Sequence, residues 1–414
     1  MSTPDPLALS SASLLLVLLA AASLLLTVVS HACVYLRLAT RRRAPAVTPP
    51  ISVLKPLKGS DDELYANLCS LAEQDYPGPF EIVLGAAEPD DPALTVAQRL
   101  RRAYPEVCIR VVPGRQGPGL NPKVANLEAF ARAARHPYLL VSDSNVRVGP
   151  RYLRDTAAPL ADPRVGLVTN VLAGIGERSL GAALENIHLN GFIAGAVCAA
   201  DLLVHHPCVV GKSMLMPRAA LERVGGFESV RDVLGEDYLL GVAMKRAGYR
   251  VVLSPHVIGT VNRRWSVGRF MARHLRWSQM RRWIAPTAYL FEPLLNPVPW
   301  LLAIASAALA GGMGEAAGTW LALALGMVGL KVASDVALGL RLRGERPRGI
   351  SPLLVPLKDV IVLGIWLVAW VHRSVQWRGN RMRIGPGSAL YPPRRRARSA
   401  EVAVVTAAPV DEAA

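Results

Sequence analysis

The chain has 414 residues, 51% of them hydrophobic, and a formal net charge of +16 at pH 7. This composition is too apolar for an ordinary soluble enzyme of that length, so we expect membrane-spanning segments. The positive charge does not indicate nucleic-acid binding, because the arginines gather beside apolar stretches, where they suit anionic lipids, and the sequence has no nucleic-acid-binding motif.

The first predicted element is an N-terminal membrane anchor. Residues 6–36 contain no Asp, Glu, Lys or Arg, and a helix of this length, rising about 1.5 Å per residue, can cross a hydrocarbon core of about 30 Å. A signal peptide would have a shorter apolar core and its basic residues first, whereas Arg41, Arg42 and Arg43 follow the apolar run. Since positive flanks resist translocation, we expect residues 1–43 to be an uncleaved anchor and the next domain to be cytosolic.

Residues 44–285 are predicted to form this domain, with an α/β fold. Short apolar runs, which indicate buried strands, alternate with amphipathic segments, which indicate helices. The alternation favours a parallel sheet covered by helices, in which ligands bind beyond the carboxyl ends of the strands. The predicted strands are 51–54, 80–86, 107–112 and 138–142, and the predicted helices are 61–73, 92–103 and 121–134.

Polar side chains follow three of these strands. Lys55 follows the first strand, Asp91 comes shortly after the second, and Asp143 and Asn145 follow the fourth. Acids at one edge repel a pyrophosphate unless a divalent cation lies between them, so we predict a Mg2+ or Mn2+ diphosphate site at this edge. Each acid alone could equally be the N-cap of the next helix, and only the ordered set supports the hypothesis.

A further acid is predicted at the start of a later helix. The run Gly235-Glu236-Asp237-Tyr238 begins an apolar-periodic stretch that reaches Ala247. A purely structural role for Asp237 would be to cap this helix. Its functional role would be that of a general base, which takes the proton of an acceptor hydroxyl.

The run Arg-His-Leu-Arg-Trp at 273–277 lies on a basic amphipathic stretch before the C-terminal apolar region. One interpretation is an interfacial helix, with arginines and tryptophans at the membrane surface. On a helix, Arg273 and Arg276 also share one face with Trp277. Both guanidinium groups could therefore hold a leaving diphosphate while the indole packs behind them.

Residues 286–385 are predicted to form a C-terminal membrane region, with apolar stretches at 293–314, 316–340 and 349–371. One stretch could be re-entrant or interfacial, because arginines after the last one also favour the cytoplasm. Lys331 and Asp335, at i,i+4 spacing in the second stretch, are expected to neutralise each other rather than to form a transport pathway. Residues 386–414 are expected to be a disordered tail.

Two other segments have competing interpretations. The apolar segment 184–210 could be a lipid-facing acceptor region or an ordinary buried helix and strand, and the sequence favours neither. Gly211-Lys212-Ser213 is not a phosphate-binding Walker motif, because the glycine required five residues before the lysine is missing.

Taken in chain order, the acids and the Arg-Trp run resemble the D, D, D, (Q/R)xxRW signature of ceramide glucosyltransferases. The resemblance extends from about residue 10 to 385, and it implies a GT-A fold that binds a divalent metal. It further implies inverting transfer from UDP-glucose to the primary hydroxyl of ceramide, a lipid acceptor in the bilayer. The signature residues are Asp91, Asp143, Asp237, Arg273, Arg276 and Trp277, and further similar segments are 51–59, 119–127 and 143–148.

The resemblance also implies a role for each residue. Asp237 would be the base, Asp143 the acid that holds the metal or diphosphate, and Asp91, preferred over Asp90, a nucleotide contact. The Asp-Ser-Asn run departs from a full DxD motif, which leaves metal ligation by Asn145 open. The residues assigned to donor binding are Lys55, Asp91, Lys123, Asp143, Arg273, Arg276 and Trp277.

Three alternative functions are considered. Hopanoid-associated glycosyltransferases share the acids and the anchors but would act on a hopanoid polyol. A processive polysaccharide synthase shares the acids and a similar motif but needs more spans to line a channel, and a membrane scaffold needs neither acids nor motif. The alanine- and arginine-rich composition is typical of GC-rich bacterial genomes and hence favours an inner membrane, whereas the oligomeric state is left open.

Overall fold

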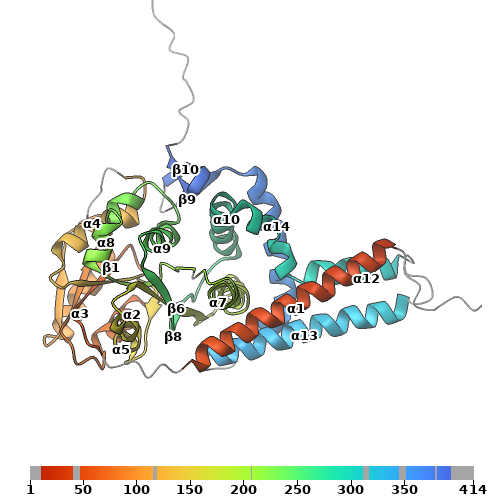
Figure 1. Ribbon diagram of the computed structural model, residues 1–414, viewed down its shortest axis with the longest axis horizontal. Helices are drawn as coiled ribbons and strands as arrows, with labels where there is room; N and C mark the ends of the chain where they lie inside the picture. The colour runs from red at the N-terminus through yellow and green to blue at the C-terminus, as the bar shows by residue number, and fades with distance from the viewer. Residues whose placement is uncertain are drawn as a thin grey trace, which may run out of the picture.

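The computed structural model describes residues 11–40, 47–114, 119–206, 208–310, 317–344, 351–377 and 380–392. Figure 1 shows a domain built around a sheet, with a bundle of long helices that extends away from it. The N-terminal helix and helices from the C-terminal third of the chain lie side by side in this bundle. Its members are α1 (Ser11–Ala39), α12 (Val298–Leu309) and α13 (Ala317–Arg343).

The β-α units predicted from residue 51 onward are confirmed. Each predicted strand and helix is present, with ends that differ by a few residues at most. The strands are β1 (Ile51–Pro56), β2 (Phe80–Gly85), β3 (Cys108–Val111) and β4 (Tyr138–Ser142), and the helices are α2 (Leu64–Ala72), α3 (Pro92–Ala103) and α4 (Pro122–Ala133).

The sheet is mixed rather than wholly parallel: its first four strands pair in parallel, and so do β6 and β8. Its strand order is β3-β2-β1-β4-β7-β6-β8-β5, and β7 runs antiparallel to both of its neighbours, β4 and β6. In this register Ser142, the last residue of β4, pairs with Ser213, the first residue of β7. The loop that leaves β4 and the loop that enters β7 therefore lie side by side. The later strands are β5 (Val146–Arg147), β6 (Val165–Ile175), β7 (Ser213–Pro217) and β8 (Arg250–Val261).

Apolar side chains fill both faces of the sheet. On one face α2, α3 and α5 (Tyr152–Ala157) bury Leu68, Leu100 and Tyr152. On the other face α4, α8 (Arg218–Arg223) and α9 (Glu236–Arg246) bury Phe130 and Leu240. Because helices cover both faces, β1, β2 and β4 are buried along nearly their whole length, and the polar groups gather in the loops at the strand ends.

Four helical segments are long and apolar enough to cross a membrane, which indicates an integral membrane protein. Three match predicted apolar stretches, whereas the fourth, Leu180–Leu203, was predicted only as a lipid-facing or buried segment. The predicted stretch 293–314 contains only α12, whose 12 residues span about 18 Å and are too short to cross alone. The four segments are α1, α13, α14 (Leu354–Val371) and the run of α6 (Leu180–His188), η2 (Leu189–Ile193) and α7 (Ala194–Leu203).

The charged side chains inside this helical region are paired. The Lys331 ammonium lies 2.5 Å from the Asp335 carboxylate, so the predicted mutual neutralisation is confirmed. Lys358 contacts Asp359 on α14, and the His31 ring on α1 lies 3.5 Å from Asp335. Lys331 also lies 3.7 Å from Asp359, so these buried contacts link α1, α13 and α14.

A small sheet follows the last membrane helix. Its strands are β9 (Ser374–Trp377), β10 (Asn380–Ile384) and β11 (Leu390–Tyr391), and it lies beside α10 (Val267–Ile284) in Figure 1. The tail predicted from residue 386 therefore starts too early, because the Pro386–Ser388 turn and β11 are ordered parts of this sheet unit. Residues 393–414 lie outside the described residues. The remaining short elements are η1 (Ala158–Ala161), η3 (Phe227–Val230), α11 (Pro286–Leu290), η4 (Glu292–Leu295) and η6 (Ser351–Leu353).

Candidate active site

The side-by-side loops after β4 and before β7 form the centre of a charged cluster. Asp143 and Asn145 come from the first loop, and Lys212 comes from the second. Lys123 enters from the start of α4, where the Asn121 side chain caps the helix by accepting hydrogen bonds from the backbone N–H groups of residues 123 and 124. The start of α9 completes the cluster with two acids.

Asp143 is held by two ammonium groups. Its Oδ1 lies 3.0 Å from Lys123 Nζ and its Oδ2 lies 2.9 Å from Lys212 Nζ. Lys212 Nζ also donates a hydrogen bond of 2.8 Å to Asn145 Oδ1. Burial alone would raise the pKa of the Asp143 carboxyl, but the two lysines hold that pKa well below its usual range. Asp143 is therefore ionised at any physiological pH.

Lys123 links this pair of loops to α9. Its Nζ lies 3.0 Å from Glu236 Oε1 and donates to the Gly211 carbonyl at 3.1 Å. Burial would lower the pKa of Lys123, but Asp143 and Glu236 hold it well above its usual value. Lys123, predicted as a donor-binding residue, is thus a permanent cation at the centre of the cluster.

Asp237, the predicted base, lies at the start of α9 as expected. Its Oδ2 accepts a hydrogen bond of 2.6 Å from Gly211 N, and its Oδ1 accepts one of 2.8 Å from Tyr238 N. A Cβ atom at Gly211 would lie 2.8 Å from Asp237 Oδ2, so the loop can approach the carboxylate this closely only because residue 211 is glycine. Burial, and next the adjacent Glu236 carboxylate, raise the pKa of Asp237 to about 6.

Lys55 lies beneath the cluster rather than in it. Its side chain is fully buried, and Nζ donates to Ser142 Oγ and to the Val146 carbonyl, both at 3.3 Å. Burial lowers the pKa of Lys55 to about 7. In this conformation Lys55 supports the loop that carries Asp143 from below.

Asp91 has structural contacts at the edge of the same sheet. One oxygen accepts a hydrogen bond of 2.9 Å from Ala93 N and so caps α3, and both oxygens accept from Gly59 N, at 2.9 and 3.0 Å. The carboxylate therefore fastens the loop after β1 to α3. The structural role that the sequence left open for a strand-end acid is present at Asp91.

On α10, Arg273 and Arg276 have different partners. The Arg273 guanidinium lies 3.1 Å from Glu185 Oε1 and 4.4 Å from the centre of the Trp277 ring. Glu185, fully buried on α6, also binds His274 at 2.8 Å. Arg276 donates instead to the Gln376 carbonyl on β9. The structure thus brings Arg273 and Trp277 together and directs Arg276 to the C-terminal sheet.

The C-terminal sheet is joined to the loop that precedes the predicted base. Leu234 N donates to the Ser388 carbonyl at 3.0 Å, and Gly235 N donates to Ser388 Oγ at 3.2 Å. Leu390 N donates to the Asp232 carbonyl at 2.7 Å. The residues directly before Glu236 are therefore held by hydrogen bonds from a part of the chain more than a hundred residues away.

The centre of the site contains oxygen atoms of the kind that bind a divalent cation. Asp143 Oδ2 and Asn145 Oδ1 both point at one position, which the Lys212 ammonium fills. Carboxylate and amide oxygens suit Mg2+ and Mn2+, and such ions commonly take one or two protein oxygens, with phosphate and water as the other ligands. Among the described residues no group of three or more His, Cys, Asp or Glu side chains could hold a metal ion.

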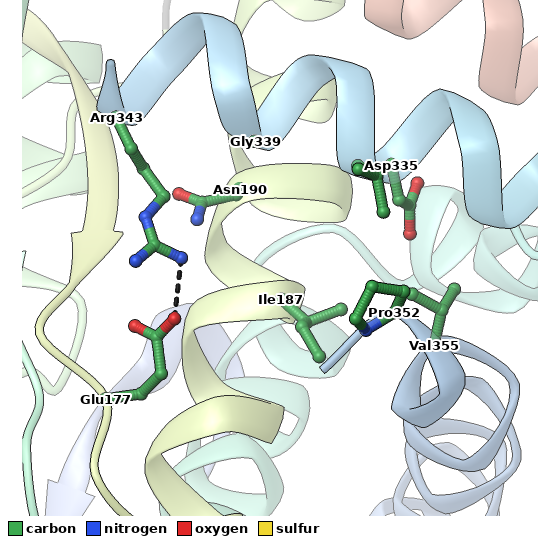
Figure 2. Close-up of a pocket in the computed structure, with 9 residues that line it drawn as sticks. Glu177, Ile187, Asn190, Asp335, Gly339, Arg343, Pro352 and Val355 are labelled. Atoms are coloured by element: carbon green, nitrogen blue, oxygen red, sulfur yellow. Dashed lines mark hydrogen bonds and ion pairs between the residues drawn. The ribbon is translucent and has the colours of Figure 1, made fainter. Parts of the chain in front are cut away.

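A small cavity lies between α6, α13 and α14. Figure 2 shows the Glu177–Arg343 ion pair, 2.7 Å long, at one end of it and Asp335 at the other, with Ile187 and Pro352 between them. The cavity has a volume of about 30 Å³.

Two charged residues of the site were missed by the sequence analysis. Lys212 belongs to a motif rejected as a phosphate loop, and only the antiparallel register of β4 and β7 brings it to Asp143. Glu185 lies in a segment considered only for its apolar character. No sequence signal identified Glu185 as the partner of Arg273, since 88 residues of chain separate them.

The fold resembles that of a solved glycosyltransferase. The structure aligns with the mannosyltransferase PcManGT from Pyrobaculum calidifontis, solved in complex with GDP-Man and Mn2+, over 87% of this chain and 99% of that one, with a TM-score of 0.50 and 18% identity. The fold is that of a GT-A glycosyltransferase, as predicted. The identity is low enough that this likeness concerns the fold alone.

Residues 15–390 match the model of glycosyl transferase family 21, and the chain belongs to that family. It is 26% identical over 375 residues to ceramide glucosyltransferase 3 of Caenorhabditis elegans, covering 86% of this chain and 78% of the relative. It is 29% identical over 260 residues to ceramide glucosyltransferase 1 of the same animal, covering 60% of this chain and 53% of that relative. The predicted family is confirmed, and the protein is a membrane glycosyltransferase.

Proposed function

We propose that the protein transfers a hexose, with inversion, from a UDP-sugar to the primary hydroxyl of ceramide, giving a glycosylceramide. UDP-glucose is the proposed donor, in keeping with the family's named relatives. The observation that carries the proposal is Asp237, a carboxylate with a pKa raised to about 6 beside a cluster of cations. Such a group is poised to accept a proton near neutral pH.

The proposed reaction is a single displacement. Asp237 takes the proton of the ceramide hydroxyl while that oxygen bonds to C1 of the sugar, and the bond from C1 to the diphosphate oxygen breaks. The electron pair of that bond leaves with UDP, whose diphosphate gains one negative charge. Backbone N–H groups of Gly211 and Tyr238 hold the carboxylate in place, so little reorganisation precedes the proton transfer.

Cationic side chains are proposed to bind the diphosphate. Lys123 lies at the centre of the cluster, and Arg273 is oriented by Glu185 and Trp277. Asp143 and Asn145 would hold a divalent cation, Mg2+ or Mn2+. The bound cation would neutralise charge on the leaving diphosphate. Asp91 is the proposed nucleotide contact, and Lys55 is proposed to support the donor site from below.

The lipid acceptor is proposed to arrive along α7. This helix packs against α1, and its end exposes two apolar side chains, Leu203 at 59% and Val204 at 70% exposure. The chain then leads within a few residues to Gly211, which contacts Asp237. This connection between a helix that packs on α1 and the residue that contacts the base supports entry of the acceptor beside α7.

The active domain is proposed to face the cytosol, in a bacterial inner membrane. The argument is the positive flank Arg41–Arg43 after α1, which resists translocation. These three arginines lie outside the described residues. Cytosolic UDP-sugars would then reach the site directly.

The test of the base is the variant Asp237→Asn, which keeps the shape of the side chain and removes its basicity. We expect transfer to ceramide to fall at least about a hundredfold, as is typical when a general base is lost. Glu106→Gln, an exposed acid to amide change in the same domain, is the matched control and should keep full activity. Expression and elution volume in detergent should match the wild type, and activity retained by Asp237→Asn would refute the assignment.

A further inference from the structure

The Lys212 ammonium occupies the position between two oxygens at which the proposed function places a divalent metal ion. Its Nζ lies 2.9 Å from Asp143 Oδ2 and 2.8 Å from Asn145 Oδ1. These are hydrogen-bond distances, so no space is left between the ammonium and either oxygen for a second ion. The lysine side chain is 13% exposed, and the Asp143 side chain 23%.

The second carboxylate oxygen of Asp143 is also bound by an ammonium group. Its Oδ1 is bound by Lys123, which is fixed at the same time by Glu236 and by the Gly211 carbonyl. Lys212 is less constrained, because its carboxylate partner is Asp143 alone among the described residues. Of the two lysines, Lys212 is the one that can leave with the smaller loss of contacts.

The backbone beside Lys212 links this position to the base. Gly211 N donates to Asp237, and Gly211 O accepts from Lys123. Lys212 therefore extends from a loop whose preceding residue touches both the base and the central cation. A shift of the Lys212 side chain can occur while these backbone contacts persist, since they do not involve its side chain.

We propose that Lys212 is an internal counter-ion that keeps divalent metal out of the donor-free site and moves to the diphosphate when the nucleotide binds. A divalent ion beside a buried ammonium would meet strong repulsion, so metal alone binds weakly. An incoming diphosphate supplies new anionic partners for the lysine and releases the oxygens of Asp143 and Asn145. Metal and nucleotide then bind together. This inference rests on the proposed function of the same site.

The test measures Mn2+ binding directly, by the loss of the electron paramagnetic resonance signal of free Mn2+ on adding purified protein in detergent. Lys212→Met removes the ammonium and nearly conserves the volume. Without nucleotide, it should bind Mn2+ at least tenfold more tightly than the wild type. Lys212→Arg, which keeps a cation, should behave as the wild type does. Lys245→Met, the same change at an exposed lysine of α9, is the control and should leave Mn2+ affinity unchanged.

UDP should raise the Mn2+ affinity of the wild type strongly and that of Lys212→Met much less. If Lys212→Met and the wild type bind Mn2+ equally tightly without nucleotide, the proposed role of Lys212 is wrong, whereas the proposed function is not contradicted. Absence of Mn2+ binding in every variant, even with UDP, would contradict the metal site in the proposed function as well. If Lys212→Met fails to fold, Lys212→Gln, which keeps a hydrogen-bond donor and removes the charge, supplies the same comparison.

Discussion

The raised pKa of the Asp237 carboxyl determines the pH range in which this residue can act as a base. Its carboxyl is half-buried and adjacent to Glu236, and these two influences raise its pKa to about 6. A general base acts only when it is ionised, so the fraction of competent enzyme falls as the pH falls through this value. The raised pKa therefore predicts the position of the acidic limb of the pH–rate profile.

We expect kcat/KM for the transfer reaction to be constant above about pH 7 and to fall tenfold per pH unit well below pH 6. The measurement is initial rate against pH at low donor concentration, with protein integrity confirmed after each incubation. Glu236→Gln removes the like charge beside Asp237 and should move the limb to lower pH. A limb near pH 4 in the wild type would contradict the raised pKa.

At the residue scale, the sequence predicted where the acidic residues of the site lie but not which basic residues they pair with. The order of Asp91, Asp143 and Asp237 along the chain was enough to place them at strand and helix ends, and the structure has them there. The ion pairs of Lys212 and Glu185 depend on strand register and on helix packing across distant segments. Local sequence patterns contain no information on either, so these contacts could not be predicted.

The C-terminal sheet is an element that the sequence analysis assigned partly to membrane and partly to tail. Its apolar side chains form a small core with Leu234, and Leu390 is 3% exposed in it. Alternation of buried and exposed residues in β10 is short and is surrounded by arginines, so the local pattern did not identify a strand. The hydrogen bonds that Leu234 N and Gly235 N donate to Ser388 connect this sheet to the loop before Asp237.

The variant Leu390→Asp tests whether the C-terminal sheet supports the loop before Asp237. It would bury an unpaired carboxylate, so the sheet should detach from the domain, and the loop before Asp237 should lose its support. We expect transfer activity to fall at least about tenfold, equivalent to about 1.4 kcal/mol in the barrier, with KM for the donor less affected. Activity is to be compared with that of Asn380→Asp, which adds the same charge at an exposed position of β10. Equal activity of the two variants would show that the sheet does not support the site.

At the scale of elements, the first half of the domain was predictable and the second half was not. Each β-α unit up to β4 is local in sequence, and hydrophobic periodicity identifies such units. β7 pairs with β4 from 71 residues further along, counting from Ser142 to Ser213, after the α6–α7 run has intervened. The pairing of β7 with β4 could therefore not be predicted from the local hydrophobic pattern.

At the scale of the whole molecule, buried ion pairs connect the membrane helices to one another. Lys331 lies 2.5 Å from Asp335 on the same helix and 3.7 Å from Asp359 on α14. Removing one partner of such a pair leaves an uncompensated buried charge, which costs far more than replacing both. The network therefore predicts a strong dependence of stability on charge balance.

We expect Lys331→Met to destabilise the protein by roughly 3 kcal/mol, seen as a clear fall in the thermal transition in detergent. The double variant Lys331→Met with Asp335→Asn should recover at least half of that loss, because no charge is then left unpaired by the change. The readout is the midpoint of unfolding by tryptophan fluorescence. A double variant less stable than Lys331→Met alone would rule out mutual neutralisation as the role of the pair.

The central claim is that the enzyme glycosylates ceramide through Asp237. The most direct measurement incubates purified protein in detergent with Mn2+, a panel of UDP-sugars, and ceramide, diacylglycerol or a hopanoid polyol. Products are identified by lipid mass spectrometry, and the anomeric configuration by proton NMR. The account predicts a β-linked hexosylceramide from UDP-glucose, absent with Asp237→Asn. A glycosylated hopanoid or a long glycan without any ceramide product would contradict it.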